Sequence, residues 1–342
     1  MAISLYTNAS SGNPVNTYQS PELLAAADAV QVIDKFVKGQ RVPLHKNENV
    51  DFLRAVTPNV DVSESLEGIS KASREITFEN VSVRIQEFAE SFAFSSRQAN
   101  LSATDLFEAS KDRLRDLKHR TREQNGWLTY RNTNNVFYNS QAISSRSAVN
   151  GPISLGVLHK LDRLLQDNRA KYVMEMSKAS TSYSTYPVEA CWPVFCHTDC
   201  RSDIRAIPGF IPEPQVSGNT RSPVRCFGHV ENFAFYPSPE FIPRLGAGAA
   251  VGATGMKSAG GVNVDVYNYV VMGREAFGRI MLAGSETEGG AGGESYTILK
   301  DPDKSDRDNR IRVIVCNWHD GPVILNQNWC ASIECGVTAN PV

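Results

Sequence analysis

The sequence lacks the signals of a secreted or membrane protein. Its first residues, MAISLYTNASSGNPVNTYQSPELL, contain no basic start followed by an apolar run, which a secretory signal requires. Nowhere do about 18 apolar residues follow one another without interruption, as a membrane-spanning helix would need. We therefore expect a soluble protein that is made in a cytosol and has no membrane partner.

A strong charge of one sign and a dense cysteine framework are also missing. The formal net charge is −2 and the isoelectric point is about 6.3, so the chain as a whole offers phosphate no general attraction. This disfavours sequence-specific DNA binding. The seven cysteines are an odd number scattered over the second half, unlike the paired cysteines of a small secreted domain. Free thiols are the expected state.

What is present is mostly the composition of a globular protein. Of the 342 residues, 41% are hydrophobic and 21% are charged, which is close to the average of soluble domains. A chain of this length can bury one large core or two moderate ones. Residues 1 to about 24 differ, because they are rich in Ser, Asn, Thr and Pro. They are typical of a tail that is ordered only by contact with something else.

A thin β-hairpin is predicted after this tail. Val50 and Phe52 alternate with polar residues, as in a half-buried strand. A second strand begins near Ile76, and its apolar parity changes at Glu79 and Asn80, which predicts a bulge there. The two strands are joined by a polar stretch, SESLEGISKASRE. Such a hairpin is too thin to hold a core of its own and must pack against a neighbour.

Two amphipathic helices are predicted. The longer one runs from about 102 to 124, is capped by Ser102 or Thr104, and ends before Gly126. Its segment KDRLRDLKHRTRE alternates basic with acidic residues, so we interpret it as a solvated face rather than a nucleic-acid site. The shorter helix begins at Ser154 and ends near Asp167.

The second half of the chain predicts mainly β-strands. A cap at Thr198 or Asp199 and a short helix are expected after the first of them. Two glycine-rich stretches, 246–261 and 284–294, disfavour any regular element, and residues 127–138 are expected to form a connector. Strands are predicted over 190–196, 230–236, 264–272, 296–299, 311–318 and 322–333, and around Ile280 and Leu282.

One cluster has the residue types of a zinc site, namely Cys191, Cys196, His197 and Cys200. Its spacing argues against zinc, because a strand through this region would point Cys196 and His197 to opposite faces, and paired CxxC knuckles are absent. We interpret the cysteines as buried thiols beside a capping turn. A metal-dependent enzyme with a Cys/His zinc site is kept as an alternative hypothesis.

Other enzyme motifs are weak. Gly246, Gly248 and Gly252 have glycines spaced as in a dinucleotide-binding loop, but no strand and helix flank them, so a mobile loop is favoured. Cys200, His197 and Asp203 offer the residue types of a catalytic triple, yet nothing resembles a nucleophile elbow. The sequence therefore predicts no catalytic residue, cofactor or metal.

What remains is a pattern of projections: a tail, a thin hairpin, a long helix covered on one side, and glycine-rich loops. Such features are stable when identical neighbours cover them. The sequence predicts a structural protein that assembles with its own copies. The predicted packing positions on the hairpin and the long helix are Phe52, Ile76, Phe78, Val83, Ile85, Phe107 and Leu117.

Several segments, in their order along the chain, resemble the major capsid proteins of tailed phages with the Hong-Kong-97-like fold, in the branch found in N-four-type podoviruses. The resemblance spans nearly the whole chain. The segments are TREQNGWLTYRNTNNVFY, SLGVLHKLDRLLQDNRAKY, CWPVFCHTDCRSDIRAI, YNYVVMGREAFGRIML and VIVCNWHDGPVILNQNWCASIECGV.

The resemblance implies an α+β fold and a division of the chain. Its parts are an N-terminal arm over 1–37, an extended β-hairpin loop over 38–80, a peripheral domain over 81–149 and 283–342 that contains the spine helix (about 102–124), and an axial domain over 150–282.

The resemblance also implies self-assembly into pentamers and hexamers of an icosahedral virion head around double-stranded DNA, after assembly in the host cytoplasm. The implied partners are a portal, a scaffolding protein and, optionally, a decoration protein, with non-specific contact to the packaged DNA. A bacterial nanocompartment shell protein of the same fold is a further alternative.

Overall fold

The computed structural model describes residues 31–43, 48–56, 73–95, 106–140, 142–174, 190–213, 226–252, 254–282, 295–299 and 310–339, and single residues at 60, 62, 67, 71, 97 and 224. The expected N-terminal tail, the cap at Ser102 or Thr104 and the glycine-rich stretch 284–294 lie outside these residues. So does most of the polar stretch that joins the two hairpin strands.

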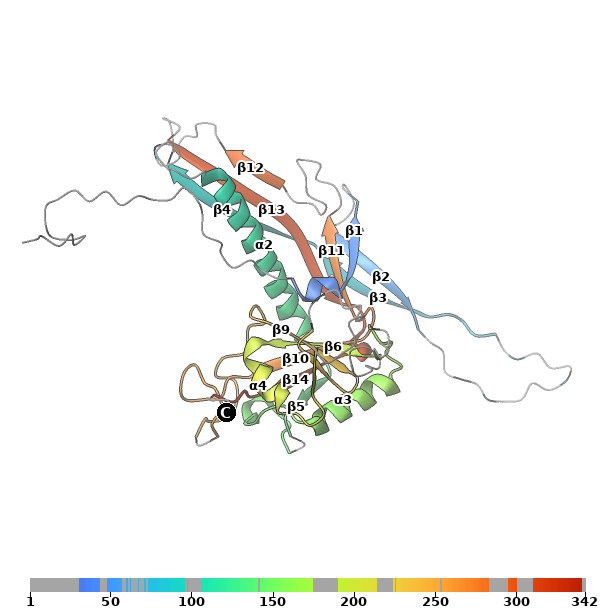
Figure 1. Cartoon of the computed structure of the whole chain (residues 1–342). Coiled ribbons are helices and arrows are strands. Elements are labelled where there is room, and N and C mark those ends of the chain that lie inside the picture. Colours follow the sequence, from blue (N-terminus) through green and yellow to red (C-terminus); the bar gives the residue numbers. More distant parts are fainter. Residues whose placement is uncertain are drawn as a thin grey trace, which may run out of the picture.

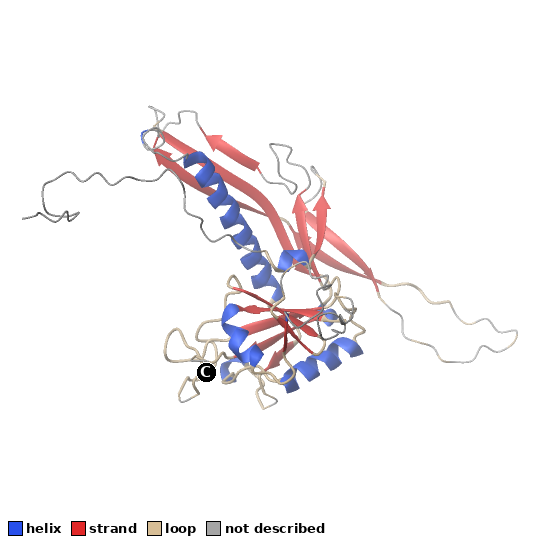
Figure 2. Ribbon diagram, viewed as in Figure 1, coloured by secondary structure: helices blue, strands red, loops and turns tan. Residues whose placement is uncertain are grey.

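Three parts are visible in Figure 1: a lobe built on a mixed β-sheet, an elongated sheet with a long helix beside it, and a thin hairpin that projects away from both. Figure 2 shows that strands dominate and helices are few, which matches the predicted α+β class.

The lobe contains a seven-stranded sheet. Its central strand β10 pairs antiparallel with β14 on one side and β6 on the other, whereas β6 with β9, and β14 with β5, run parallel. In spatial order the strands are β5 (Val136–Tyr138), β14 (Cys330–Cys335), β10 (Tyr267–Met272), β6 (Trp192–His197), β9 (Phe233–Ser238), β8 (Gly228–Val230) and β7 (Ile211–Pro212).

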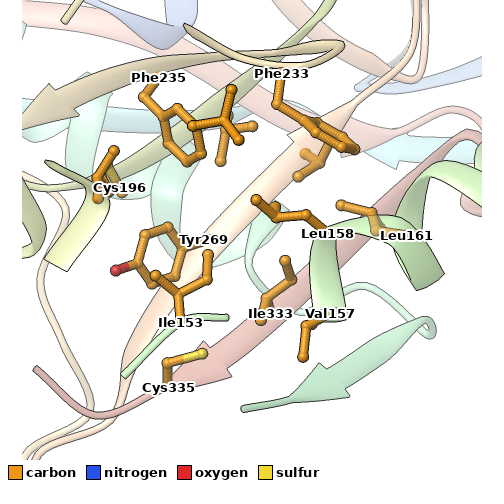
Figure 3. Close-up of a cluster of buried hydrophobic side chains, with 14 of the residues drawn as sticks. Ile153, Val157, Leu158, Leu161, Cys196, Phe233, Phe235, Tyr269, Ile333 and Cys335 are labelled. Carbon is orange, nitrogen blue, oxygen red and sulfur yellow. The ribbon is translucent and has the colours of Figure 1, made fainter. Parts of the chain in front are cut away.

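Both faces of this sheet are buried. Helix α3 (Leu155–Asp167) packs its apolar stripe, including Leu158 and Leu161, against Phe233 and Ile333 on one face (Figure 3). A second cluster on the other face contains Phe195 and takes in residues from the end of the long helix. Because successive strand residues point to opposite faces, near-continuous apolar strands are what a sheet covered on both sides needs.

The elongated sheet is built on one long strand, β13 (Ile311–Ile324). It pairs antiparallel with β4 (Gln86–Ser95) over ten residues, and also with β11 (Phe277–Leu282) and β12 (Ser295–Leu299). β1 (Lys38–Val42) adds parallel to β11 at the edge. β13 therefore extends beyond the predicted end at residue 318, and the predicted strand 322–333 is divided by the short helix η5 (Gln327–Trp329) before β14.

The long helix α2 (Leu106–Tyr130) lies along β13 and β4. Its predicted end before Gly126 is wrong, because the helix continues through this glycine to Tyr130. Gly126 is required by packing rather than by termination, since a Cβ there would lie 2.7 Å from Nη2 of Arg279. The solvated-face interpretation also needs correction, because Lys118 and Glu123 are both only 1% exposed.

The hairpin consists of β2 (Asn49–Ala55) and β3 (Phe78–Arg84), which pair antiparallel over seven residues. The register is continuous through Glu79 and Asn80, so the predicted bulge is wrong. The apolar parity changes because Phe78 points to the face opposite Val81 and Val83, and that face is exposed.

The remaining short elements connect these parts. They are the 3-10 helices η1 (Ile33–Lys35), η2 (Arg146–Ala148) and η3 (Thr198–Cys200), and helix α4 (Arg201–Arg205). The predicted single strand over 230–236 is instead two strands, β8 and β9, separated by a turn. No helix among the described residues is long and apolar enough to cross a membrane.

The chain enters the body earlier than the sequence-based boundaries place it. Val32 and Ile33, assigned to the arm, are buried in the second core cluster. β1, assigned to the extended loop, is part of the elongated sheet. The division into arm, loop, peripheral and axial domains stays a prediction.

Candidate assembly surfaces

The inner face of the hairpin packs within the chain at its base. Val50, Phe52 and Val83 are half-buried there, on one face of the β2–β3 pair. They contact a small core cluster on the elongated sheet formed by Val42, Ile85 and Ile280. Three of the predicted packing residues, Phe52, Val83 and Ile85, therefore come together and anchor the hairpin.

The outer face of the hairpin carries exposed apolar side chains. Ile76 is 68% exposed and Phe78 is 64% exposed. Sequence reasoning missed Leu53, which is 73% exposed on the same face as Phe78, and also Val60 and Val62. The signal was present, because Leu53 interrupts the polar parity of strand β2. Because Leu53 and Phe78 lie on one face of the hairpin, this face is a candidate interaction surface.

The two predicted packing residues on α2 lie elsewhere. Phe107 is half-buried, and its ring meets that of Phe94 edge to face at a centroid distance of 4.8 Å. Leu117 is half-buried on the same helix. The seven predicted residues are thus divided among three places and do not form one site, and their contacts between subunits stay a prediction.

A groove with a volume of about 830 Å³ lies between the hairpin and the lobe. Its walls carry both signs of charge, and two of the lining residues, Lys38 and Glu275, pair at 3.3 Å. The hairpin side includes Phe52, Leu53, Val56 and Val81, and the lobe side includes Asn168, Arg169, Leu325 and Trp329. Among the described residues that line this groove, no set of catalytic side chains converges.

A buried carboxylate ties the start of the described chain to α2. Oε1 of Glu123 accepts hydrogen bonds from the backbone N–H groups of Val32 (3.0 Å) and Ile33 (2.8 Å). Burial raises the pKa of Glu123 to about 7, although the two backbone bonds and the neighbouring Arg122 act in the opposite direction. Nε2 of Gln31 also lies 2.8 Å from Nδ1 of His119.

A buried arginine joins this segment to the elongated sheet. Arg279 on β11 is 2% exposed and pairs with Asp34 of η1 and, at 2.9 Å, with Asp320 of β13. Asn125 of α2 donates to Asp320 at 2.9 Å. Arg122 adds a further ion pair to Asp34 at 3.2 Å. These contacts join η1, α2, β11 and β13 at the junction between the lobe and the elongated sheet.

The Cys/His cluster does not form a zinc site. Cys191 lies in the core cluster on one face of the lobe sheet, whereas Cys196 and Cys200 lie in the cluster on the other face. Nδ1 of His197 accepts a hydrogen bond from the backbone N–H of Asp199 at 3.1 Å, so His197 is the cap that was predicted at Thr198 or Asp199. Among the described residues, no group of three or more His, Cys, Asp or Glu side chains is placed to hold a metal ion.

The other weak motifs also have structural roles. The backbone N–H of Gly246 donates to Asp265 at 2.7 Å, and a Cβ on Gly248 would lie 2.8 Å from the carbonyl oxygen of Val149. Gly248 thus allows close packing of a loop, Gly246 adopts a left-handed backbone conformation with a φ of 61°, and neither glycine connects a strand to a helix. Asp203 accepts from the backbone N–H of Thr338 at 3.0 Å, and Cys200 is fully buried, so the Cys200, His197 and Asp203 triple is not an accessible catalytic site.

Comparisons with known proteins place this architecture. No family model and no curated protein matches the sequence. The chain is similar in structure to the capsid of Ralstonia phage GP4, at 12% identity and a TM-score of 0.66, with 98% of this chain and 100% of that chain covered. It is also similar to the capsid of cyanophage Pam1, at 10% identity and a TM-score of 0.63, with 99% and 100% covered.

An encapsulin has the same fold at a lower score. The SrpI encapsulin of Synechococcus elongatus PCC 7942 matches at 8% identity and a TM-score of 0.58, with 96% of this chain and 94% of that chain covered. At these identities the comparisons establish the fold rather than the activity. The Hong-Kong-97-like α+β capsid fold predicted from the sequence is confirmed: over nearly its full length the chain has the fold of these phage capsid chains, while the N-four-type branch stays a prediction.

Proposed function

We propose that this chain is the major capsid protein of a tailed bacteriophage and that it has no catalytic role. The observation that carries the proposal is the hairpin β2–β3, which projects from the body with Leu53, Ile76 and Phe78 exposed. A monomer in water gains nothing from such a projection, whereas a shell of copies buries it at every contact. The full-length likeness in fold to phage capsid chains supports the same function.

In this function the copies form pentamers and hexamers of an icosahedral head. Apolar burial stabilises a contact by about 25 cal/mol per Å², but the loss of translational and rotational freedom offsets much of this gain. Individual contacts are therefore weak and reversible, and the closed lattice is stable because each subunit makes many of them. Of the seven predicted packing residues, the exposed Ile76 and Phe78 belong to these intersubunit contacts, whereas Phe52, Val83 and Ile85 anchor the hairpin within the chain.

The shell would enclose double-stranded DNA in the virion, after assembly in the host cytoplasm. A net charge of −2 favours a shell whose inner surface contacts the DNA only weakly, because strong binding of phosphate needs a surplus of Lys and Arg. A portal, a scaffolding protein and, optionally, a decoration protein are the further proposed partners. The likeness to an encapsulin keeps a nanocompartment shell as the rival, which shares the fold and differs in its contents.

Electron microscopy of the purified full-length chain, expressed alone and with the genes adjacent to its own, tests the proposal. We expect closed icosahedral particles, or rings of five and six copies that close when a scaffolding protein is present. Particles that package an enzyme and no DNA would favour the nanocompartment. A chain that stays monomeric under every assembly condition would contradict both shell functions.

A further inference from the structure

Three arginines converge on one buried glutamate where α2 meets the lobe. Glu334 on β14 is fully buried, and Arg146 pairs with it through two hydrogen bonds, from Nε to Oε2 at 2.8 Å and from Nη2 to Oε1 at 2.7 Å. Nε of Arg244 lies 3.8 Å from the same carboxylate. Arg131, just beyond the end of α2, interacts electrostatically with Arg244, Arg146 and Glu334. We call Arg131, Arg146 and Arg244, together with Glu334, the arginine cluster.

The backbone and its polar groups hold these arginines in place. Nη1 of Arg131 donates to the carbonyl oxygen of Ile242 at 3.0 Å. Two residues further, Nη2 of Arg244 donates to Oδ1 of Asn132 at 2.6 Å. The segment from Ile242 to Arg244 and the end of α2 are thus cross-linked in both directions, and the two guanidinium groups are kept close together.

The cluster has more positive charge and more donors than the described residues neutralise. Three guanidinium groups face one carboxylate, which leaves a formal surplus of two positive charges. The Nε atoms of Arg131 and Arg244 are buried with no hydrogen-bond acceptor among the described residues. A distance of 3.8 Å to Glu334 is too long for a hydrogen bond. Arg146 remains 38% exposed and Arg244 20% exposed, so solvent reaches the cluster.

The electrostatics agree with this geometry. The pKa of Arg131 is lowered to about 10, first by burial and then by the charges of Arg244 and Arg146, and Glu334 only partly compensates. The pKa of Arg244 is also lowered, by burial and by Arg146. A bound anion would reduce the repulsion between guanidinium groups that are held together in this way.

The rim of the cluster is apolar. Leu128, one turn before Arg131 on α2, is 43% exposed, while Ile242 is 41% and Leu245 is 64% exposed. A DNA backbone offers phosphates but no apolar groups to cover such a rim, whereas a protein segment with a carboxylate flanked by apolar side chains fits both features.

We propose that the arginine cluster is an oxyanion site that receives a carboxylate from a second copy of this chain, with Leu128, Ile242 and Leu245 as its apolar rim. This inference rests on the proposed shell function, because that function surrounds each subunit with copies. The carboxylate would pair with Arg131 and Arg244, which leaves Arg146 to neutralise Glu334.

Two variants and one control test the site in the full-length protein. Arg244→Gln and Arg131→Gln remove one positive charge each and leave the Arg146–Glu334 pair intact, while Arg113→Gln removes the same charge from the exposed surface of α2. We expect each cluster variant to raise the protein concentration needed for assembly by about tenfold, the loss expected for a partly buried charge pair, and the control to change it by less than about twofold. Equal behaviour of the three variants would overturn the inference, provided that the wild-type chain assembles.

A second measurement does not depend on assembly. Inorganic phosphate should raise the melting temperature of the unassembled wild-type chain more than sodium chloride of equal ionic strength, and Arg244→Gln should abolish the difference. No difference in the wild type would overturn the oxyanion site itself. If a short DNA duplex bound the chain, and its binding required Arg131 and Arg244 while assembly was unaffected by their substitution, the ligand of the site would be DNA and not a second copy of the chain. Failure of the wild type to form any particle would refute the shell function, and with it the intersubunit part of this inference, while the phosphate measurement still decides the anion site.

Discussion

Replacement of Glu123 by glutamine should flatten the dependence of this protein's stability on pH between about 4.5 and 7. The Glu123 side chain lies against the backbone of Val32 and Ile33 and is 1% exposed. Glutamine retains a carbonyl oxygen that can accept the same two backbone hydrogen bonds, and it cannot ionise. The substitution thus tests the carboxylate's charge with little change of shape.

The direction and size of the expected change in stability follow from the raised pKa of Glu123. Burial raises the pKa of Glu123 from 4.5 to about 7, so in this window the folded chain binds more protons than the unfolded chain. Stability therefore falls as the pH rises from about 4.5 to 7, and the deficit persists above pH 7. A rise of the Glu123 pKa from 4.5 to about 7 corresponds to about 3 kcal/mol in the free energy of unfolding.

The assay is urea denaturation of the unassembled chain at intervals between pH 4.5 and 8, for the wild type, Glu123→Gln and a control, Glu108→Gln. Glu108 is an exposed glutamate on the same helix. We expect the wild type and the control to lose about 3 kcal/mol more than Glu123→Gln across the window. Identical pH profiles for all three proteins would refute the reasoning, because they would mean that Arg122 and the backbone N–H groups keep the buried carboxylate ionised.

Three further substitutions separate the core, the junction and the assembly surface. Leu158→Ala removes a fully buried side chain from the lobe core and should lower the free energy of unfolding by about 2–5 kcal/mol in urea denaturation; a loss below about 1 kcal/mol would contradict the packing described. Arg279→Met should cost about 3–5 kcal/mol in the same assay, because Asp34 and Asp320 lose their partner inside the junction; a neutral effect would show that the two carboxyl groups are not buried charges. Phe78→Ser should change the stability of the unassembled chain by less than about 0.5 kcal/mol, because its side chain is 64% exposed, but should suppress particle formation in electron microscopy; normal particles would remove Phe78 from the proposed contacts.

Local patterns in the sequence were sufficient to predict a helix or strand wherever one face of that element is buried in the chain's own core. The spacing of Val157, Leu158 and Leu161 predicted α3, which begins and ends at the expected residues. The alternation at Val50 and Phe52 predicted β2. In both cases the period of the apolar residues matches the period of the element, and a single neighbouring surface covers them.

The tertiary structure decided the features that depend on distant parts of the chain. The sequence predicted a helix end at Gly126, but this residue lies inside α2. A glycine is present there because the Arg279 guanidinium from β11 approaches too closely for a side chain. Glu123 reads as part of a solvated face but is buried, because residues 31–36 fold back over α2. The sequence predicted a bulge near Glu79 because Phe78 is apolar on the parity opposite to Val81 and Val83. The register is continuous, and Phe78 instead lies on an exposed face, since an apolar pattern does not show whether the chain itself covers a residue.

The arginine cluster illustrates the same limit. Arg131, Arg146, Arg244 and Glu334 are separated by up to about 200 positions and show no common motif. They meet because β14, the end of α2 and the segment after β9 adjoin in the lobe. Sequence alone determined the two amphipathic helices and the thin hairpin, because these follow from local periodicity, whereas the capsid fold was implied by the resemblance of several ordered segments to a known family. Only the folded chain brought these charged residues together, because contacts between distant parts of the sequence decide which buried groups become partners, and no local sequence pattern records such contacts.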